Sequence, residues 1–147
     1  MIQKEFLTRS LVEELKPLIS EHHTEIEKNE EEVNVDWLAY QVLQENNLFY
    51  FYTARAKGEL LGYLGYIVTH NLHYRNHKYA LCDLIYVSPQ YRGKFLAVKL
   101  LKHAEVELSK LGVRDICQPV RVDHDFGPIL KRQGYKIEEY NYGKRIH

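Results

Sequence analysis

An apolar strand, a short basic loop and a long amphipathic helix follow one another between residues 79 and 112. Residues 79–87 are apolar almost throughout, which is typical of a strand in the middle of a sheet. Ser88-Pro89 ends this strand, and residues 90–94 form the loop. The apolar side chains of the following stretch recur on one helical face, and they are Leu96, Leu100, Leu101, Ala104 and Leu108. A strand that leads through a tight loop into such a helix predicts an α/β fold.

Two helices are expected before this unit, and further strands on either side of it. Ser10 and Glu13 have the spacing of a capping box for the first helix, and Pro17 is expected to kink or divide that helix. Asp36 is expected to cap the second helix. Strands are predicted at residues 48–56, 60–69, 79–87, 113–122 and 135–142, with a turn at Lys57-Gly58, a loop at residues 70–78 and a short helix from Asp125. The expected order is α-α-β-β-β-α-β-α-β, in a single domain of residues 1–147.

Composition narrows the function classes. The chain has 20 Lys+Arg and 20 Asp+Glu, so its formal net charge is zero and argues against a partner held by phosphate neutralisation, such as nucleic acid. Cys82 and Cys117 each lie in an apolar run, which favours buried, reduced thiols. The first residues lack the apolar stretch of a signal peptide, and no apolar run approaches the roughly 20 residues of a membrane span. A cytoplasmic protein with no membrane partner is therefore expected.

The segment from Val87 to Val113, VSPQYRGKFLAVKLLKHAEVELSKLGV, resembles the coenzyme A motif of the GNAT superfamily of N-acetyltransferases. Members of that superfamily have a strand, a loop reading Arg/Gln-x-x-Gly-x-Gly/Ala and a long helix. Arg92 matches the first position of this loop and Ala97 the last. Phe95 stands where the family usually has glycine, which is a departure from the pattern.

A second stretch, HDFGPILKRQGYK at residues 124–136, is similar to the other signature of the family, an Asn-led short helix that ends in Leu-Gly-Phe. Gly134-Tyr135 matches its end, and spacing back from Gly134 puts His124 on the Asn position. Leu130 falls where many members carry a tyrosine general acid. Small phage-borne members resemble this chain most, through their "LHY" and "DFGP" stretches and an aromatic residue in the loop.

The resemblance implies the GNAT fold, a mixed and mostly antiparallel central sheet flanked by helices. It implies acetyl-CoA as co-substrate and a primary amine, on a small molecule or a protein, as acceptor. In the family, a splayed central strand holds the thioester and pantetheine, and the loop holds the pyrophosphate. The residues at matching positions are Ile85, Tyr86 and Val87 on the strand, and Arg92, Gly93, Lys94, Phe95, Leu96 and Ala97 at the loop.

Physical chemistry supports a phosphate site at the loop. Successive backbone N–H groups in a turn that opens a helix supply several donors to a pyrophosphate, and the helix dipole adds to the attraction. Gly93 permits close approach, Arg92 and Lys94 add positive charge, and the Phe95 ring is expected to turn into the core or against the cofactor. Taken alone, Arg-Gly-Lys fits an ordinary strand-to-helix loop, and the flanking strand, helix and second signature favour the cofactor site.

Three residues are candidates for proton transfer. Asp83 is a carboxylate in an otherwise apolar strand, where burial would make it a better proton acceptor near neutral pH. A buried Asp that only accepts structural hydrogen bonds is an equally good interpretation. His73 and His124 are second choices because imidazole titrates near neutral pH, although a structural or loop role is favoured for each. Tyr74, Tyr86 or water would replace the missing tyrosine acid at Leu130.

Metal chemistry is not expected, because the spacing of His70, His73 and His77 matches no zinc pattern. Two other functions stay open beside the enzyme: a non-catalytic module that binds acyl-CoA, and a nucleobase-modifying relative. Acceptor specificity is assigned to the loops at residues 20–36 and 70–78, but the sequence identifies neither the acceptor nor the oligomeric state.

Overall fold

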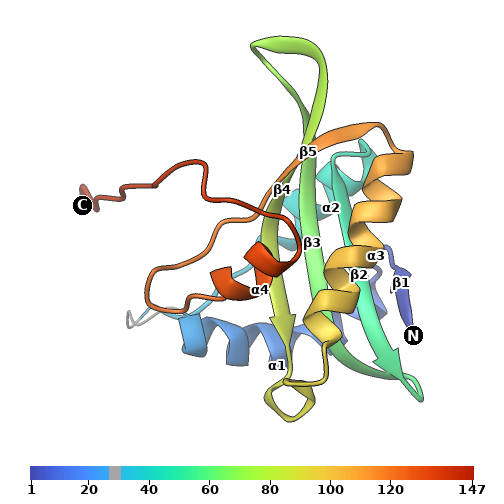
Figure 1. Ribbon diagram of the computed structural model, residues 1–147. Coiled ribbons are helices and arrows are strands. Elements are labelled where there is room, and N and C mark those ends of the chain that lie inside the picture. Colours follow the sequence, from blue (N-terminus) through green and yellow to red (C-terminus); the bar gives the residue numbers. More distant parts are fainter. Residues whose placement is uncertain (27–30) are drawn as a thin grey trace.

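The computed structural model describes residues 1–26 and 31–147 and contains a five-stranded sheet in the order β1-β2-β3-β4-β5, with helices on both faces (Figure 1). The α/β fold predicted from the sequence is confirmed. In chain order the elements are β1 (Ile2–Lys4), α1 (Arg9–Ile26), α2 (Trp37–Glu45), β2 (Phe49–Ala56), β3 (Glu59–Asn71), β4 (Tyr74–Val87), the 3-10 turn η1 (Pro89–Tyr91), α3 (Leu96–Lys110), β5 (Val113–Cys117) and α4 (Gly127–Arg132).

The sheet is mixed and mostly antiparallel, as expected. Each of the strands β1 to β4 pairs antiparallel with the next strand in the chain. Strand β5 pairs parallel with β4 after the crossover through α3. The β3–β4 ladder runs as far as Val87, whereas the β4–β5 ladder covers only Lys78–Leu81 of β4. In the described chain, β4 therefore has one open edge from Cys82 onward, and this edge lies beside the loop that leads to α3.

Each sheet face has its own apolar core. On one face, side chains of β2 to β4 pack against α3 and α4 through Leu100, Leu101 and Leu130. On the other, Phe49, Phe51 and Tyr63 pack against α1 and α2. None of the helices in the described residues has an apolar stretch of the length that crosses a bilayer.

The elements at the two ends of the sheet differ from the predictions. Strand β1 was not predicted, because its three residues are too few to establish an alternating pattern. The predicted strand at residues 135–142 is wrong, since this segment pairs with no strand in the described chain. An alternating pattern favours a strand, but a neighbouring backbone must be available to pair with it. The strand predicted at 113–122 already ends at Cys117.

The predicted loop at residues 70–78 is also wrong. β3 continues to Asn71 and β4 begins at Tyr74, so the strands extend as a long hairpin whose turn is Leu72-His73. The hairpin projects beyond the rest of the sheet (Figure 1). Its polar residues face solvent on both sides, and their polarity reflects this exposure rather than a loop conformation.

The helix starts have capping side chains, and one of the two predicted caps is wrong. Asp36 caps α2 as predicted by accepting a hydrogen bond from Ala39 N at 3.0 Å. The first helix is capped by Thr8, whose Oγ1 accepts from Leu11 N at 3.2 Å, so the prediction of Ser10 as the cap is wrong. Pro17 lies inside an α1 that runs without a break to Ile26. The predicted loop at 20–36 is therefore shorter, and its residues 27–30 lie outside the described part of the chain.

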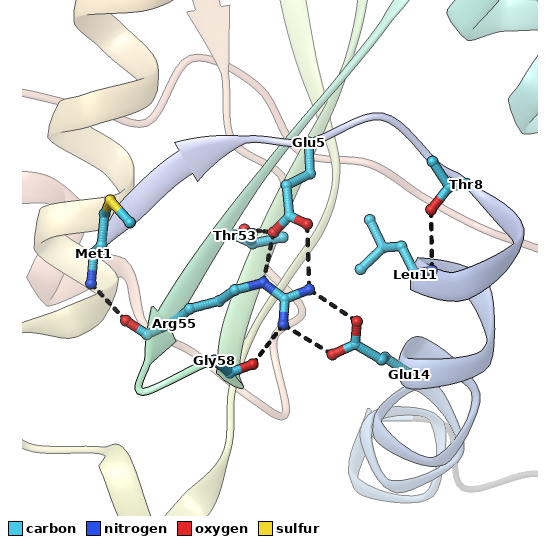
Figure 2. A network of polar contacts seen from close by, with 8 residues as sticks. All are labelled: Met1, Glu5, Thr8, Leu11, Glu14, Thr53, Arg55 and Gly58. Carbon is cyan, nitrogen blue, oxygen red and sulfur yellow. Dashed lines mark hydrogen bonds and ion pairs between the residues drawn. The ribbon is translucent and has the colours of Figure 1, made fainter.

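A polar network ties β1, β2 and α1 together (Figure 2). The Arg55 guanidinium donates to both Glu5 and Glu14, and Thr53 donates to Glu5. Arg55 also donates to the Gly58 carbonyl at 2.8 Å, which joins the β2–β3 turn to the network. These contacts fix the short β1 strand and the start of α1 against the sheet.

Candidate functional site

A cleft of about 1440 Å³ extends along the open edge of β4 and continues beneath α1 and α2. Its wall includes the residues predicted to bind a cofactor, with the exception of Lys94. They are Ile85, Tyr86, Val87, Arg92, Gly93, Phe95, Leu96 and Ala97. Asp83 and His124 line the same cleft. The fold thus brings together residues from a strand, a loop, the start of a helix and a distant C-terminal segment.

The open edge of β4 presents backbone hydrogen-bonding groups to the cleft. Ser88 N donates to Leu61 O of β3 at 2.9 Å, so alternate residues before Ser88 also bond to β3. By this alternation, the backbone groups of Val87 and Ile85 face away from β3 and toward the open edge. Arg92 Nε donates to Val87 O at 2.8 Å, which agrees with that direction. An extended amide-containing ligand can therefore pair with β4 where β5 has diverged.

The loop before α3 has the geometry of an anion site. Gly93 has φ +79°, and a Cβ atom built there meets nothing within 4 Å, so its requirement for glycine is conformational. Phe95 has φ +61°, which accounts for the glycine that related loops carry at this position. The α3 helix begins at Leu96, and the N–H groups of its first turn have no intrahelical acceptor. These donors and the helix dipole favour a bound anion.

The Phe95 ring does not enter the core, so that part of the prediction is wrong. The side chain is 75% exposed and lines the cleft. The left-handed backbone at Phe95 directs the side chain out of the loop, away from the buried face of α3 on which Leu100 and Leu101 lie. A ring in this position can contact a molecule in the cleft.

An ion-pair network crosses the cleft from α1. Arg92 Nη2 lies 2.7 Å from Glu25 Oε2, and Glu25 Oε1 lies 3.3 Å from His124 Nε2. The hydrogen bond from Arg92 lowers the pKa of the Glu25 carboxyl and keeps it charged. The Arg92 guanidinium also lies over the Tyr86 ring, 5.4 Å from its centroid. Glu25 thereby orients both Arg92 and His124, two residues that the sequence placed in the site separately.

Asp83 is the extra residue of a β-bulge. Leu84 pairs with Gly65 and Cys82 with Tyr66, which leaves Asp83 without a partner on β3. The bulge turns the Asp83 side chain toward α2, where Tyr40 Oη donates a hydrogen bond to Asp83 Oδ2. Asp83 is exposed, so the expected burial is wrong. Simple alternation would place Asp83 on the same sheet face as Ile85 and Val87. Because of the bulge, its side chain does not lie on that face.

Two candidates lie away from the cleft. His73 is in the turn of the projecting hairpin, ten residues before Asp83, and this corresponds to roughly 33 Å of extended strand. His73, a second choice for proton transfer, does not line the cleft, and Tyr74 is on the same outer part of the hairpin. Leu130 is buried in the α3–α4 core, so the usual tyrosine position supplies no acid here.

His22 lines the cleft and was not among the candidates identified from the sequence. Its Nδ1 lies 3.0 Å from Tyr63 Oη, and its ring stacks on Tyr86 with centroids 4.8 Å apart. Burial lowers the pKa of His22 to about 4, so the ring is neutral near pH 7. The signal was present, because His22 continues the i, i+3/i+4 spacing of Leu15 and Leu18 on the buried face of α1.

The described residues contain no group of three or more His, Cys, Asp or Glu side chains arranged to hold a metal ion. Cys82 and Cys117 form no disulfide, and burial raises the pKa of both thiols. Neither cysteine is therefore activated as a nucleophile.

Comparison with known proteins gives a consistent result. The profile described as the acetyltransferase (GNAT) family matches residues 10–125. None of the curated proteins matches the chain significantly. The fold is similar to that of a ribosomal-protein-alanine N-acetyltransferase from Brucella melitensis biovar Abortus 2308, with a TM-score of 0.75, 18% identity and 99% of each chain covered.

Two further solved structures contain a cofactor. One is a predicted acetyltransferase from Clostridium acetobutylicum with acetyl-CoA, which has a TM-score of 0.75 and 14% identity and covers 99% of this chain and 97% of its own. The other is an aminoglycoside N-acetyltransferase in complex with CoA, with a TM-score of 0.73, 13% identity and coverage of 100% and 99%. At these identities the two structures establish similarity of fold.

Proposed function

The chain belongs to the GNAT acetyltransferase family, and we propose that it transfers an acetyl group from acetyl-CoA to a primary amine of a small molecule or protein. The observation that carries this proposal is the continuous wall formed by the open edge of β4 and the N-terminus of α3. Pantetheine amides would pair with Ile85 and Val87, and the pyrophosphate would accept hydrogen bonds from the loop around Gly93 and from the first turn of α3.

The reaction needs a neutral amine. The amine nitrogen attacks the thioester carbonyl carbon, the carbon–sulfur bond breaks, and the CoA thiolate takes up a proton while the new amide loses one. Asp83 is proposed as the base that removes the proton from the amine. It lies on β4 beyond Ile85 and Val87, its carboxylate reaches the cleft, and Tyr40 holds it in place. His124 remains the second candidate, although its contact with Glu25 favours a positioning role.

Binding of acetyl-CoA to the Gly93→Val variant tests the cofactor site. A β-branched residue at φ +79° strains the loop, and its side chain enters the open space around Gly93 through which the phosphates are proposed to approach. The affinity measured by calorimetry should fall about tenfold or more, or ~1.4 kcal/mol. Gly58→Val is the matched control, because Gly58 has φ +81° and open space around it but lies in the β2–β3 turn outside the cleft. Equal affinities in the two folded variants would argue against the site.

Asp83→Asn tests the proposed base. The substitution preserves shape and removes the basic oxygen, so turnover measured as released thiol should fall about 10²–10⁴-fold with little change in cofactor affinity. Asp115→Asn, on exposed β5 and outside the cleft, should retain wild-type turnover. Full activity of Asp83→Asn would transfer the role of base to His124 or His22.

Parallel titrations with acetyl-CoA, CoA and DNA separate the alternatives. Binding of acetyl-CoA without turnover of any amine would favour a non-catalytic acyl-CoA module, and salt-sensitive DNA binding would favour a nucleobase-modifying relative. The resemblance to phage-borne members and the cytoplasmic location stay predictions from the sequence.

A further inference from the structure

The part of the cleft beneath α1 and α2 is lined by a continuous row of aromatic rings. Trp37 and Tyr40 of α2 have centroids 6.2 Å apart, and the Tyr40 ring meets Phe49 of β2 edge-on at 4.9 Å. The row continues through Phe51 to Tyr63 at 6.1 and 5.7 Å. Phe49, Phe51 and Tyr63 are buried behind the cleft wall, so Trp37 and Tyr40 are the rings of this row that are partly exposed to a ligand. This surface suits an apolar or aromatic body rather than one covered with hydroxyl and ammonium groups.

The charges along the cleft are arranged around a single available carboxylate. Three carboxylates line it in the described chain: Glu25, Asp83 and Asp123. Glu25 is bound to Arg92 and His124, and Asp123 lies 3.6 Å from Arg121. Asp83 differs, because its recorded hydrogen bond comes from the neutral hydroxyl of Tyr40.

The cationic side chains of the cleft oppose a polycation. Four of them line it in the described chain, Arg92, Lys102, Arg121 and Arg132, and Glu25 and Asp123 offset the charges of Arg92 and Arg121. These cations suit a cofactor with several phosphates but repel a second or third ammonium group on the acceptor. An acceptor with one positive charge meets Asp83 without this repulsion. Because Tyr40 bonds to Asp83 and also belongs to the aromatic row, the single charge and the apolar body would lie close together on the acceptor.

We propose that the acceptor is a small primary monoamine with an aromatic or similarly sized apolar body, its amine at Asp83 and its body against Trp37 and Tyr40. This inference rests on the proposed acetyltransferase function. The bound ammonium group gives its proton to the Asp83 carboxylate, and the neutral nitrogen then attacks the thioester carbonyl. The Asp83 carboxylate and the aromatic side chains together make the cleft selective against polyamines and aminoglycosides.

The chain offers a readout that does not depend on catalysis, because Trp37 is its single tryptophan. Titrations of the CoA-bound protein with 2-phenylethylamine, spermidine, kanamycin and an alanine-led tripeptide are followed by Trp37 fluorescence. Phenylethylamine should bind at least about tenfold more tightly than the other three amines, or ~1.4 kcal/mol. Tighter binding of spermidine, kanamycin or the tripeptide would overturn the proposal.

Two controls identify the source of the preference. Asp83→Asn should weaken phenylethylamine about tenfold and leave the uncharged analogue 2-phenylethanol unchanged, since the latter makes only the ring contacts. Val42→Ala, on α2 but outside the cleft, should alter neither ligand. Equal loss for amine and alcohol in Asp83→Asn would contradict a charge contact at Asp83.

Released thiol is measured in parallel with wild-type protein and the same four amines. Acetylation of phenylethylamine with the highest kcat/KM supports the proposal. Faster acetylation of kanamycin or spermidine overturns the monoamine class while leaving the acetyltransferase function intact. Absence of acetyl-CoA binding would instead remove the proposed function, so the two failures are distinguishable.

Discussion

Two arginines form carboxylate networks toward opposite ends of α1, and they differ in what remains available to a ligand. Arg55 uses all three guanidinium nitrogens, in five hydrogen bonds to Glu5, Glu14 and the Gly58 carbonyl (Figure 2). Its side chain is 15% exposed. Arg92 bonds through Nε to Val87 O and through Nη2 to Glu25, and its side chain is 40% exposed.

The difference separates a network closed within the fold from one that can still meet a ligand. A guanidinium has five N–H donors. At Arg55 they are used within the fold, whereas within residues 1–26 and 31–147 the recorded bonds of Arg92 use two. The remaining donors of Arg92 face a cleft beside the N-terminus of α3, where they can meet an anionic ligand. The same residue type thus fastens β1 and α1 to the sheet in one place and stays open to a ligand in the other.

Arg55→Gln should give the largest effect on stability. It leaves the partly buried Glu5 and the exposed Glu14 without their shared cation, which is expected to cost about 2 kcal/mol of unfolding free energy. Urea denaturation measures this loss, and acetyl-CoA affinity measured by calorimetry should stay unchanged. A loss below about 1 kcal/mol, as for a surface pair, would remove the distinction between the two networks.

Acid should lower the stability of the folded protein through His22, which lines the cleft. Its pKa is about 4 in the folded protein against 6.5 as the model-compound value, so the unfolded chain binds the extra proton between these pH values. Stability should therefore fall as pH drops from about 6.5 to 4, by up to about 1.4 kcal/mol per pH unit. Urea denaturation of His22→Gln over this range should give a flatter profile. An identical slope in wild type and variant would contradict the buried neutral ring.

Arg92→Gln should have the opposite pattern of effects to Arg55→Gln, with little change in stability and a clear loss of acetyl-CoA affinity. The pair with Glu25 is partly exposed, so stability should change by less than about 1 kcal/mol. Acetyl-CoA affinity should fall about tenfold, or ~1.4 kcal/mol, because a charged donor is lost from the anion site. Arg114→Gln, which loses an exposed pair with Asp115 outside the cleft, is the matched control and should keep wild-type affinity.

Phe95→Gly should give the smallest effect on stability. The change should be opposite in sign to the loss that follows removal of a buried ring. Glycine relieves the left-handed backbone by about 1 kcal/mol, and greater freedom of the unfolded chain offsets part of this gain. Thermal unfolding should show unchanged or slightly raised stability. Lys57→Gly, at φ +51° in the β2–β3 turn, is the matched control. A loss of about 3 kcal/mol would mean that the ring is packed in a core after all.

Much of the fold was predictable because it depends on near neighbours in the sequence. The β4–loop–α3 unit, the Asp36 cap and the turn at Lys57-Gly58 follow from local patterns. The loop residues Arg92, Gly93 and Ala97 were identified by their resemblance to the coenzyme A motif of the GNAT superfamily, and they line the cleft. The errors lie where a segment needed a distant partner, as at residues 135–142, or where solvent exposure resembled a loop, as at residues 70–78.

The acceptor side of the cleft depended on tertiary structure. Residues 67 apart in sequence form the Arg92–Glu25 pair, and residues 43 apart form the Tyr40–Asp83 bond. The bulge that aims Asp83 at α2 arises from the register of β3 against β4, which no local pattern in β4 determines. The sequence by itself predicted the fold class and the loop proposed to bind phosphate, since both leave patterns in contiguous residues. The tertiary structure decided which carboxylate, histidine and aromatic rings meet at the cleft, because packing of α1 and α2 on the sheet sets those contacts.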